Sequence, residues 1–225
     1  MFTLALDTSA STLSVALLDD DKILSKNTIF ESGKQSEFLI PQIEKILKEN
    51  KIWYQNLSLI AATNGPGSFT GTRIGLAVAR TLKLATNLPL LLVNSCEVIA
   101  YKYRKTKSEE IFVIIDAKAD DLFCAKFLVK NQRIETALEP FLASVEDVIK
   151  FSPKQKFLLC GSGKKIAANI LSDKKIIFEM DEEEDLIEAD LVALLAYEKF
   201  CQNQKSSENL NPIYLRAPRI SERKK

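Results

Sequence analysis

The strongest constraint on the fold is a strand pattern that occurs twice in the 225-residue chain, at an offset of 109 residues. Residues 111–116 (IFVIID) align with residues 2–7 (FTLALD), and residues 122–127 (LFCAKF) align with residues 13–18 (LSVALL). In each half a short apolar strand runs into a Gly-x-Gly turn, at 65–67 and at 161–163. A repeated order of elements is typical of duplicated folds. We therefore expect an α/β protein built from two βββαβα units, with a cleft between two lobes.

Hydrophobic periodicity predicts the individual elements. In the first half it indicates strands at 2–6, 12–18, 22–30, 58–63 and 88–94, with helices at 36–47, after the glycine turn, and at 96–103. In the second half it indicates strands at 111–116, 122–127, 157–160 and 175–179, with helices at 144–150, 164–171 and 189–200. Ser36 is the expected N-cap of the first helix.

A charged, glycine-free connector at 102–110 is the best boundary between the lobes. We expect an N-terminal lobe at 1–104 and a C-terminal lobe at 105–225. About the last 15–20 residues are expected either to pack back on the first lobe or to be disordered.

Composition excludes several kinds of site. The chain has no histidine, which excludes Ser-His-Asp and Cys-His nucleophile pairs and every histidine-containing metal site. The four cysteines, Cys96, Cys124, Cys160 and Cys201, form no Cys-x-x-Cys, so we expect small core residues and neither disulfides nor zinc. The N-terminus reads as a buried strand, and no apolar run reaches membrane length, so we expect a cytoplasmic protein. With a net charge of +1, any RNA contact has to be local.

Four of the seven glycines, Gly65, Gly67, Gly71 and Gly75, fall within eleven residues. Such a cluster indicates either a phosphate cradle at a helix N-terminus or a helix with one smooth side. The lysine of a P-loop is absent, whereas Gly71, Gly75 and Ala79 repeat every four residues beside an apolar stripe that includes Ile74 and Val78. We favour close approach by a partner's helix, so that a Gly75→Leu variant is expected to stay folded but to lose its partner.

Polar side chains follow the first strand of each half. Asp7-Thr8-Ser9 and Asp116 stand at strand ends, where they act as turn formers or, opposed across a cleft, as magnesium ligands. The first turn has no glycine, lysine or arginine with which to hold a triphosphate.

Two charged stretches are expected to lie in solvent. The acidic run 181–185 is interpreted as a solvated loop. The basic end, with Arg216, Arg219, Arg223, Lys224 and Lys225, is either a solvated tail or an RNA contact.

The motifs, taken in order, closely resemble those of the bacterial TsaB (YeaZ) family. They are Asp7-Thr-Ser, Ser36-Glu-x-Leu-x-Pro41, Gly65-Pro-Gly-Ser-Phe-Thr-Gly71-x-Arg-Ile-Gly75 with Ala79, Asp116-Ala, and Pro212-x-Tyr-Leu-Arg216. The resemblance covers the whole chain, and its glycine-rich segment is highly specific. Gln35 stands where the family commonly has histidine.

The resemblance implies a two-lobed actin-like or sugar-kinase-like ATPase fold. It also implies a non-catalytic scaffold in the complex that transfers a threonylcarbamoyl group to the adenosine 3′ of the anticodon in tRNAs that read A-starting codons. Such a subunit dimerises with a TsaD-like catalytic subunit, is joined by a TsaE-like ATPase, meets tRNA through the complex and also forms homodimers.

The residues expected at the partner interface are Ser36, Phe38, Gly71, Arg73, Ile74, Gly75, Val78 and Ala79. In this superfamily the turn after the first strand wraps nucleotide phosphates, so Asp7, Thr8, Ser9 and Asp116 are expected to be a vestigial phosphate loop. No catalytic residue, metal or required cofactor is expected, and binding of ATP or ADP is expected to be weak or absent.

Two alternatives belong to other classes. One is a small-molecule kinase or ATPase of the same fold, which would bind Mg-ATP tightly and turn it over. The other is a direct tRNA-binding module, which would bind tRNA through its basic end in a salt-sensitive way.

Overall fold

The computed structural model describes residues 1–30, 33–118, 120–204 and 206–215. The first half contains the following elements: β1 (Phe2–Asp7), β2 (Leu13–Asp19), β3 (Lys22–Ile29), α1 (Gln35–Glu49), a 3-10 turn (Tyr54–Asn56), β4 (Leu57–Thr63), α2 (Phe69–Thr86), β5 (Leu90–Val93) and α3 (Ser95–Lys102). The second half contains the following: β6 (Glu110–Asp116), β7 (Asp121–Lys130), β8 (Arg133–Ser144), α4 (Val148–Phe151), β9 (Phe157–Cys160), α5 (Lys164–Asp173), β10 (Phe178–Glu179) and α6 (Ala189–Cys201).

The strands form two five-stranded sheets with one topology. The first sheet has the order β3-β2-β1-β4-β5, and the second has the equivalent order β8-β7-β6-β9-β10. In each sheet the first three strands are antiparallel, and the last two run parallel to the central strand. The predicted duplication is therefore confirmed.

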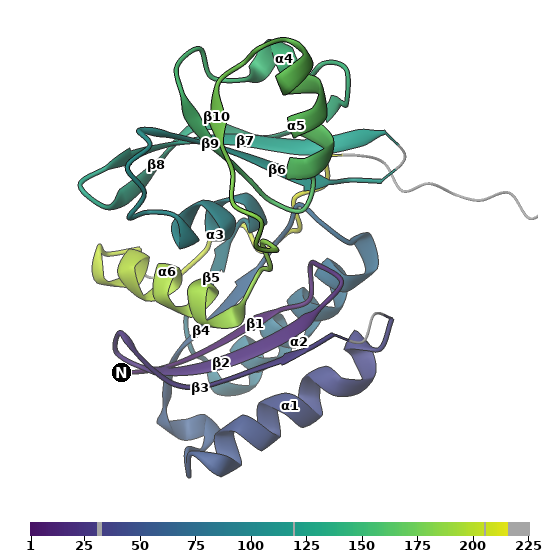
Figure 1. Ribbon diagram of the computed structural model, residues 1–225. Coiled ribbons are helices and arrows are strands. Elements are labelled where there is room, and N and C mark those ends of the chain that lie inside the picture. The colour runs from purple at the N-terminus through teal and green to yellow at the C-terminus, as the bar shows by residue number, and fades with distance from the viewer. Residues whose placement is uncertain (31–32, 119, 205, 216–225) are drawn as a thin grey trace, which may run out of the picture.

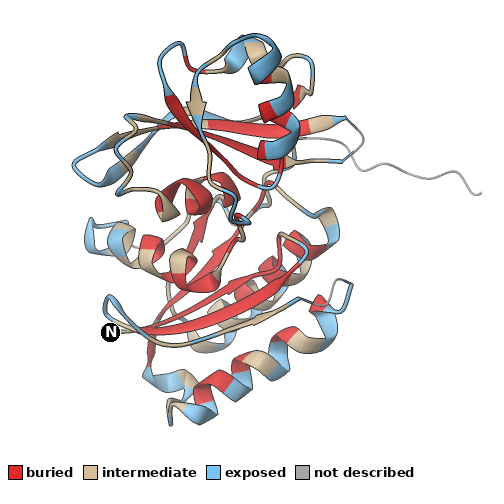
Figure 2. Ribbon diagram, viewed as in Figure 1, coloured by how far each residue is buried: buried red, intermediate tan, exposed pale blue. Residues whose placement is uncertain are grey.

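The molecule is a stack of five layers (Figure 1). Helices α1 and α2 cover the outer face of the first sheet, and α4 and α5 cover the outer face of the second. Helices α3 and α6 lie between the sheets, and the buried ribbon runs through the strands of both sheets and one side of these helices (Figure 2). Within the described residues, no helix has the length and hydropathy needed to cross a bilayer.

The two central helices are exchanged between the halves. Helix α3 belongs to the first half but packs against β6, β7 and β8, whereas α6 belongs to the second half and packs against β1, β2, β4 and β5. The division of the chain near residue 104 remains a proposal, and α6 has to be counted with the first sheet by its contacts.

Local capping explains several helix boundaries. The side chains of Ser68 and Asn94 each accept a hydrogen bond from a backbone amide in the first turn of α2 and α3. The prediction that Ser36 is an N-cap is wrong, because α1 begins at Gln35 and its N-cap Lys34 makes no side-chain cap bond.

Three predicted features differ from the structure. The helix expected at 144–150 is shorter than predicted and begins at Val148, because β8 continues to Ser144. The strand expected at 175–179 is reduced to the two residues of β10. Three of the cysteines are buried core residues as expected, but Cys201 is exposed at the end of α6.

Candidate functional site

Asp7 ends β1 and lies beneath the turn that the family resemblance leads us to expect as a vestigial phosphate loop. Its carboxylate is fully buried, and Oδ1 accepts hydrogen bonds from the Ser9 amide (3.1 Å), the Ser9 hydroxyl (2.6 Å) and the Thr63 hydroxyl. Burial raises the pKa of Asp7, and the hydrogen bonds from Ser9 and Thr63 offset only part of that rise. Asp7 therefore stabilises the turn from inside and presents no charge to solvent.

The glycine-rich segment covers this turn from the other side. The Ser68 amide donates to the Ser9 carbonyl (2.7 Å), and the Thr8 hydroxyl donates to the Gly71 carbonyl (2.7 Å). A Cβ atom on Gly71 would lie 1.9 Å from the Thr8 carbonyl oxygen, and one on Gly67 would lie 2.3 Å from that of Ser9. Glycine is needed at both positions because the turn's backbone occupies the space of a side chain. The two motifs thus form one packed unit.

The small-residue stripe of α2 faces this packed unit. Gly71, Gly75 and Ala79 are all buried, and a Cβ atom on Gly75 would lie 2.5 Å from the Thr8 hydroxyl oxygen. The prediction that a partner's helix approaches these three residues is therefore wrong, because this chain itself covers them. A leucine at Gly75 would have to displace the Thr8 side chain, so we now expect the Gly75→Leu variant to be destabilised.

Two backbone N–H groups of the packed unit are already used within the chain. Binding a phosphate at such a turn requires backbone N–H groups that point at the ligand. The Ser68 N–H instead donates to Ser9, and the Ser9 N–H donates to Asp7. Among the described residues, no group of three or more cysteine, aspartate or glutamate side chains is placed to hold a metal ion.

A cavity of about 910 Å³ opens between the two lobes. Its lining includes hydroxyl side chains from both lobes, namely Ser9, Ser11, Ser36, Ser68, Thr70, Thr72 and Ser162. Gln35 is buried and also lines this cavity.

Asp116 lines the cavity, but Asp7 lies beneath Ser9 and does not reach the lining. The structure therefore does not oppose the two carboxylates across the cleft. Asp116 accepts from the Lys118 amide (2.8 Å) and from the Lys118 ammonium (2.6 Å). Burial alone would raise the pKa of Asp116, but the hydrogen bonds from Lys118 outweigh burial and lower it.

The second Gly-x-Gly turn is occupied by a carboxylate of this chain. Gly161 has a φ of +101°, close to the +91° of Gly65, so each strand leads into a left-handed turn that favours glycine. The Gly161 amide donates to Asp185 Oδ2 (2.7 Å), and the Lys164 ammonium lies 2.9 Å from the same oxygen.

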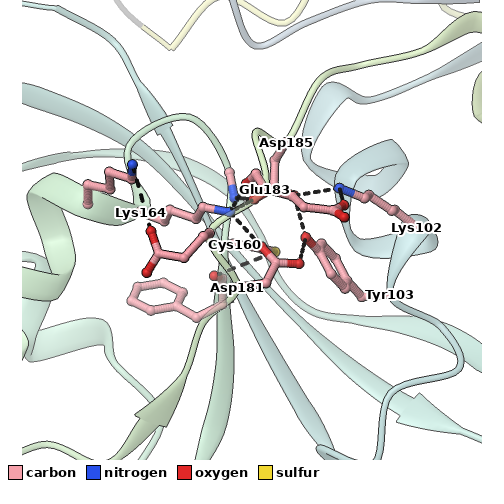
Figure 3. Close-up of polar contacts among 11 residues, drawn as sticks. Lys102, Tyr103, Cys160, Lys164, Asp181, Glu183 and Asp185 are labelled. Carbon is pink, nitrogen blue, oxygen red and sulfur yellow. Dashed lines mark hydrogen bonds and ion pairs between the residues drawn. The ribbon is translucent and has the colours of Figure 1, made fainter.

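The prediction of a solvated loop at 181–185 holds for Glu182, Glu183 and Glu184, which are exposed, but it is wrong for Asp185, which is buried. Asp185 accepts from the Tyr103 hydroxyl (2.5 Å) and lies 3.2 Å from the Lys102 ammonium, while Lys164 also contacts Asp181 at 2.8 Å (Figure 3). We call these five residues the charged cluster: Lys102, Tyr103, Lys164, Asp181 and Asp185. Because Lys102 and Tyr103 come from the first half, the charged cluster joins the two halves of the chain.

The two most buried charged groups of the cluster, Asp185 and Lys164, are each stabilised in their ionised form. Burial would raise the pKa of Asp185, but hydrogen bonds from Tyr103, Lys164 and the Gly161 amide lower it. Burial would lower the pKa of Lys164, but its bonds to Asp181 and Asp185 raise it. Burial, and then hydrogen bonds to the same two carboxylates, raise the pKa of Tyr103.

The remaining predicted interface residues lie on the outer side of α1 and α2. Ser36 and Arg73 are exposed, whereas Phe38, Ile74 and Val78 are half-buried at the edge of the outer core. Arg73 stacks on the Phe69 ring at 3.8 Å, and its Nε donates to the Tyr214 hydroxyl (2.6 Å). Ser36 and Ile74 also line the cavity, so this part of α1 and α2 borders it.

The segment 206–215 runs along the first lobe. The Ser207 amide donates to the Leu90 carbonyl (2.9 Å), the Leu92 amide donates to the Ser207 hydroxyl (2.8 Å), and the Ile213 amide donates to the Asn64 carbonyl (2.8 Å). The basic end from Arg216 to Lys225 lies outside the described residues.

Known proteins with similar sequences and structures point to one pathway. The family model for TsaD, tRNA N6-adenosine threonylcarbamoyltransferase, matches residues 31–196. The tRNA threonylcarbamoyladenosine biosynthesis protein TsaB of Buchnera aphidicola subsp. Schizaphis graminum is 31% identical over 171 residues, which is 72% of this chain and 79% of the relative.

The solved structure of YeaZ from Pseudomonas aeruginosa is 25% identical, with a TM-score of 0.78 and coverage of 95% of this chain and 99% of YeaZ. The ROK hexokinase from Thermus thermophilus is 14% identical, with a TM-score of 0.52, covering 90% of this chain and 100% of the hexokinase. The hexokinase bears on the fold alone, and both likenesses confirm the two-lobed, sugar-kinase-like architecture.

Proposed function

Because the chain belongs to the TsaB family of tRNA threonylcarbamoyladenosine biosynthesis proteins, we propose that it is the non-catalytic partner of a TsaD-type catalytic subunit. Family membership itself gives its role in tRNA threonylcarbamoyladenosine biosynthesis. Dimerisation with TsaD, the lack of catalysis, and location in the cytoplasm are parts of the proposal.

One observation carries the non-catalytic part of this proposal. The turn that would have to wrap phosphates is tied to the glycine-rich segment by two hydrogen bonds. The Ser68 amide donates to the Ser9 carbonyl, and the Thr8 hydroxyl donates to the Gly71 carbonyl. Opening that turn would break both hydrogen bonds and unpack glycines that fit nothing larger. The Asp185 carboxylate likewise occupies the Gly161 amide at the second turn. The chain therefore acts without its own cofactor or metal, and its binding of ATP or ADP is weak or absent.

The partner-binding surface of the proposal is the outer side of α1 and α2. Its half-buried apolar side chains are Phe38, Ile74 and Val78, and Ser36 and Arg73 lie at its edge. A central apolar group with polar surroundings is the usual anatomy of a protein interface. A homodimer formed through the same surface would compete with binding of the TsaD-type subunit. In this proposal a TsaE-type ATPase joins the heterodimer, and the chain meets tRNA through the assembled complex.

The test replaces one side chain on this surface. Val78→Glu would place a charge among apolar contacts. We therefore expect the dissociation constant of the heterodimer with the organism's TsaD-type subunit to rise by at least about tenfold. The measurement is light scattering after size-exclusion chromatography. The control is Ile166→Glu, an exposed apolar position on α5 of the other lobe, which should leave the heterodimer intact.

Two results would contradict the proposal. One is a folded Val78→Glu variant that binds the catalytic subunit as tightly as the original chain. The other is calorimetry in which the isolated chain binds Mg-ATP tightly and turns it over, which would favour the kinase or ATPase alternative. Omitting the chain from an assay of tRNA modification with all other components present measures its requirement directly.

A further inference from the structure

A groove of about 590 Å³ lies at one end of the second sheet, beside α4. It is lined by residues 149–150, 152–156 and 175–177. These segments meet because β9 and β10 are parallel and pair from Phe157 and Phe178, so the residues before both strands reach the same end of the sheet. The groove is therefore a fixed consequence of the sheet topology.

The groove is positively charged although the whole chain is nearly neutral. Lys150, Lys154, Lys156 and Lys175 line it, and no carboxylate does. Lys150 forms an ion pair with Asp147 at 2.6 Å, and Lys156 pairs with Glu179. Within the part of the chain that the structure describes, Lys154 and Lys175 have no ion-pair partner, and both are exposed. We call this feature the lysine groove.

The other groups in the lysine groove also suit a polyanion that carries apolar parts. Ser152 and Gln155 add neutral polar groups, and Ile177 exposes 67% of its surface at the lining. Phe151 is adjacent in sequence and is also exposed. Lysine and neutral donors bind phosphate oxygens, while exposed apolar side chains contact sugars and bases.

We propose that the lysine groove binds the phosphate backbone of tRNA while the outer side of α1 and α2 holds the catalytic subunit. This inference rests on the proposed function, because it takes tRNA as the polyanion that the assembled complex meets. The partner surface belongs to helices of the first lobe and the lysine groove lies beside α4 of the second lobe, so the two do not share residues and both can be occupied together (Figure 1).

The experiment titrates labelled tRNA with the heterodimer of this chain and its TsaD-type subunit, using fluorescence anisotropy between about 50 and 200 mM salt. The variant is Lys154→Ala with Lys175→Ala. Each phosphate contact contributes about one unit to the slope of log affinity against log salt, so we expect the slope to fall by about two. At the lowest salt we expect about a tenfold loss of affinity. The matched control is Lys105→Ala with Lys107→Ala, which removes two exposed charges from the connector between the lobes.

Equal affinity and slope for the groove variant and the control would overturn the inference. Loss of the heterodimer with unchanged tRNA affinity would also overturn it, and would assign the lysine groove to an acidic protein surface. If the original chain forms no heterodimer at all, the proposed function fails, and the same titration on the chain alone still tests the groove. Thermal melting of the variants checks that the exposed substitutions leave the fold unchanged.

Discussion

At the scale of single residues, the glycine-rich segment packs directly against the backbone of the turn after β1. Gly67 and Gly71 leave room for the backbone of Thr8 and Ser9, and hydrogen bonds join the same segments. A motif this dense in glycine suggests a ligand, but here the approaching group is another part of the chain.

The close contact at Gly71 gives a stability prediction. Gly71→Ala places a Cβ atom 1.9 Å from the Thr8 carbonyl oxygen, so the turn or the helix has to move. We expect a loss of about 2–3 kcal/mol in the free energy of unfolding, despite the better helix propensity of alanine. Urea denaturation measures it. Ala77→Gly, at an exposed position of the same helix, should cost about 1 kcal/mol, and an equal or smaller loss at Gly71 would contradict the close fit.

The charged cluster allows a comparison between neighbouring lysines. Lys164 is buried between Asp181 and Asp185, whereas Lys165 is exposed and lies 4.0 Å from Glu182. Removing one partner of a buried ion pair leaves an uncompensated charge, so Lys164→Met should cost about 3–5 kcal/mol of unfolding free energy. Lys165→Met should change it by less than about 1 kcal/mol. Similar losses in the two variants would show that the cluster is solvated.

The lowered pKa of Asp185 also predicts a pH dependence with a definite sign. An unfolded aspartate has a pKa of about 3.9, so below that value the unfolded chain takes up a proton that folded Asp185 still lacks. Stability from this group is fully present above about pH 3.9 and is lost as the pH falls toward the folded pKa. Denaturation between about pH 5 and pH 2 should give a flatter profile for Asp185→Asn than for the original chain. Parallel profiles would contradict the lowered pKa.

At the scale of elements, the segment 206–215 completes an edge of the first sheet. Ser206 and Ser207 hydrogen-bond to Leu90 and Leu92 of β5, the last strand in the sheet order. The rest of the segment passes α2, where Tyr214 contacts Arg73 and Phe69. The segment therefore connects the edge strand with the proposed partner surface.

Removing this segment should loosen β5 selectively. In a chain truncated after residue 204, we expect the amide of Leu92 to exchange with deuterium faster, because its hydrogen bond to the Ser207 hydroxyl is lost. The central strand β1 keeps its neighbours on both sides and should exchange as before. Hydrogen exchange followed by mass spectrometry gives both values, and unchanged exchange at Leu92 would contradict the role of the segment.

Most elements of this fold could be predicted from the sequence, because buried strands such as β1 and β6 are apolar runs that end at an aspartate. The positions of α3 and α6 could not, since an apolar helix face does not tell which sheet it covers. The charged cluster was missed because lysines and carboxylates look the same in sequence whether they are paired or solvated. The direction of the glycine stripe was missed because helical periodicity identifies a smooth face and does not identify its neighbour.

At the scale of the whole molecule, the exchange of α3 and α6 makes the halves interdependent. Without residues 105–225 the inner face of the first sheet loses α6, and without residues 1–104 the second sheet loses α3. We expect each half expressed alone to lack a cooperative thermal transition, and the two halves expressed together to recover one. Circular dichroism melting measures this, and a cooperative transition for either half alone would contradict the interdependence.

The exchange also has a consequence for synthesis on the ribosome. The first sheet is complete in sequence at Val93, but α6, which covers its inner face, ends only at Cys201. At roughly 5–20 residues per second, the ribosome adds the intervening residues in about 5–20 seconds. During that interval an apolar sheet face is open to chaperones and to other nascent chains. The first half can therefore complete its fold only after the ribosome has translated α6 in the second half.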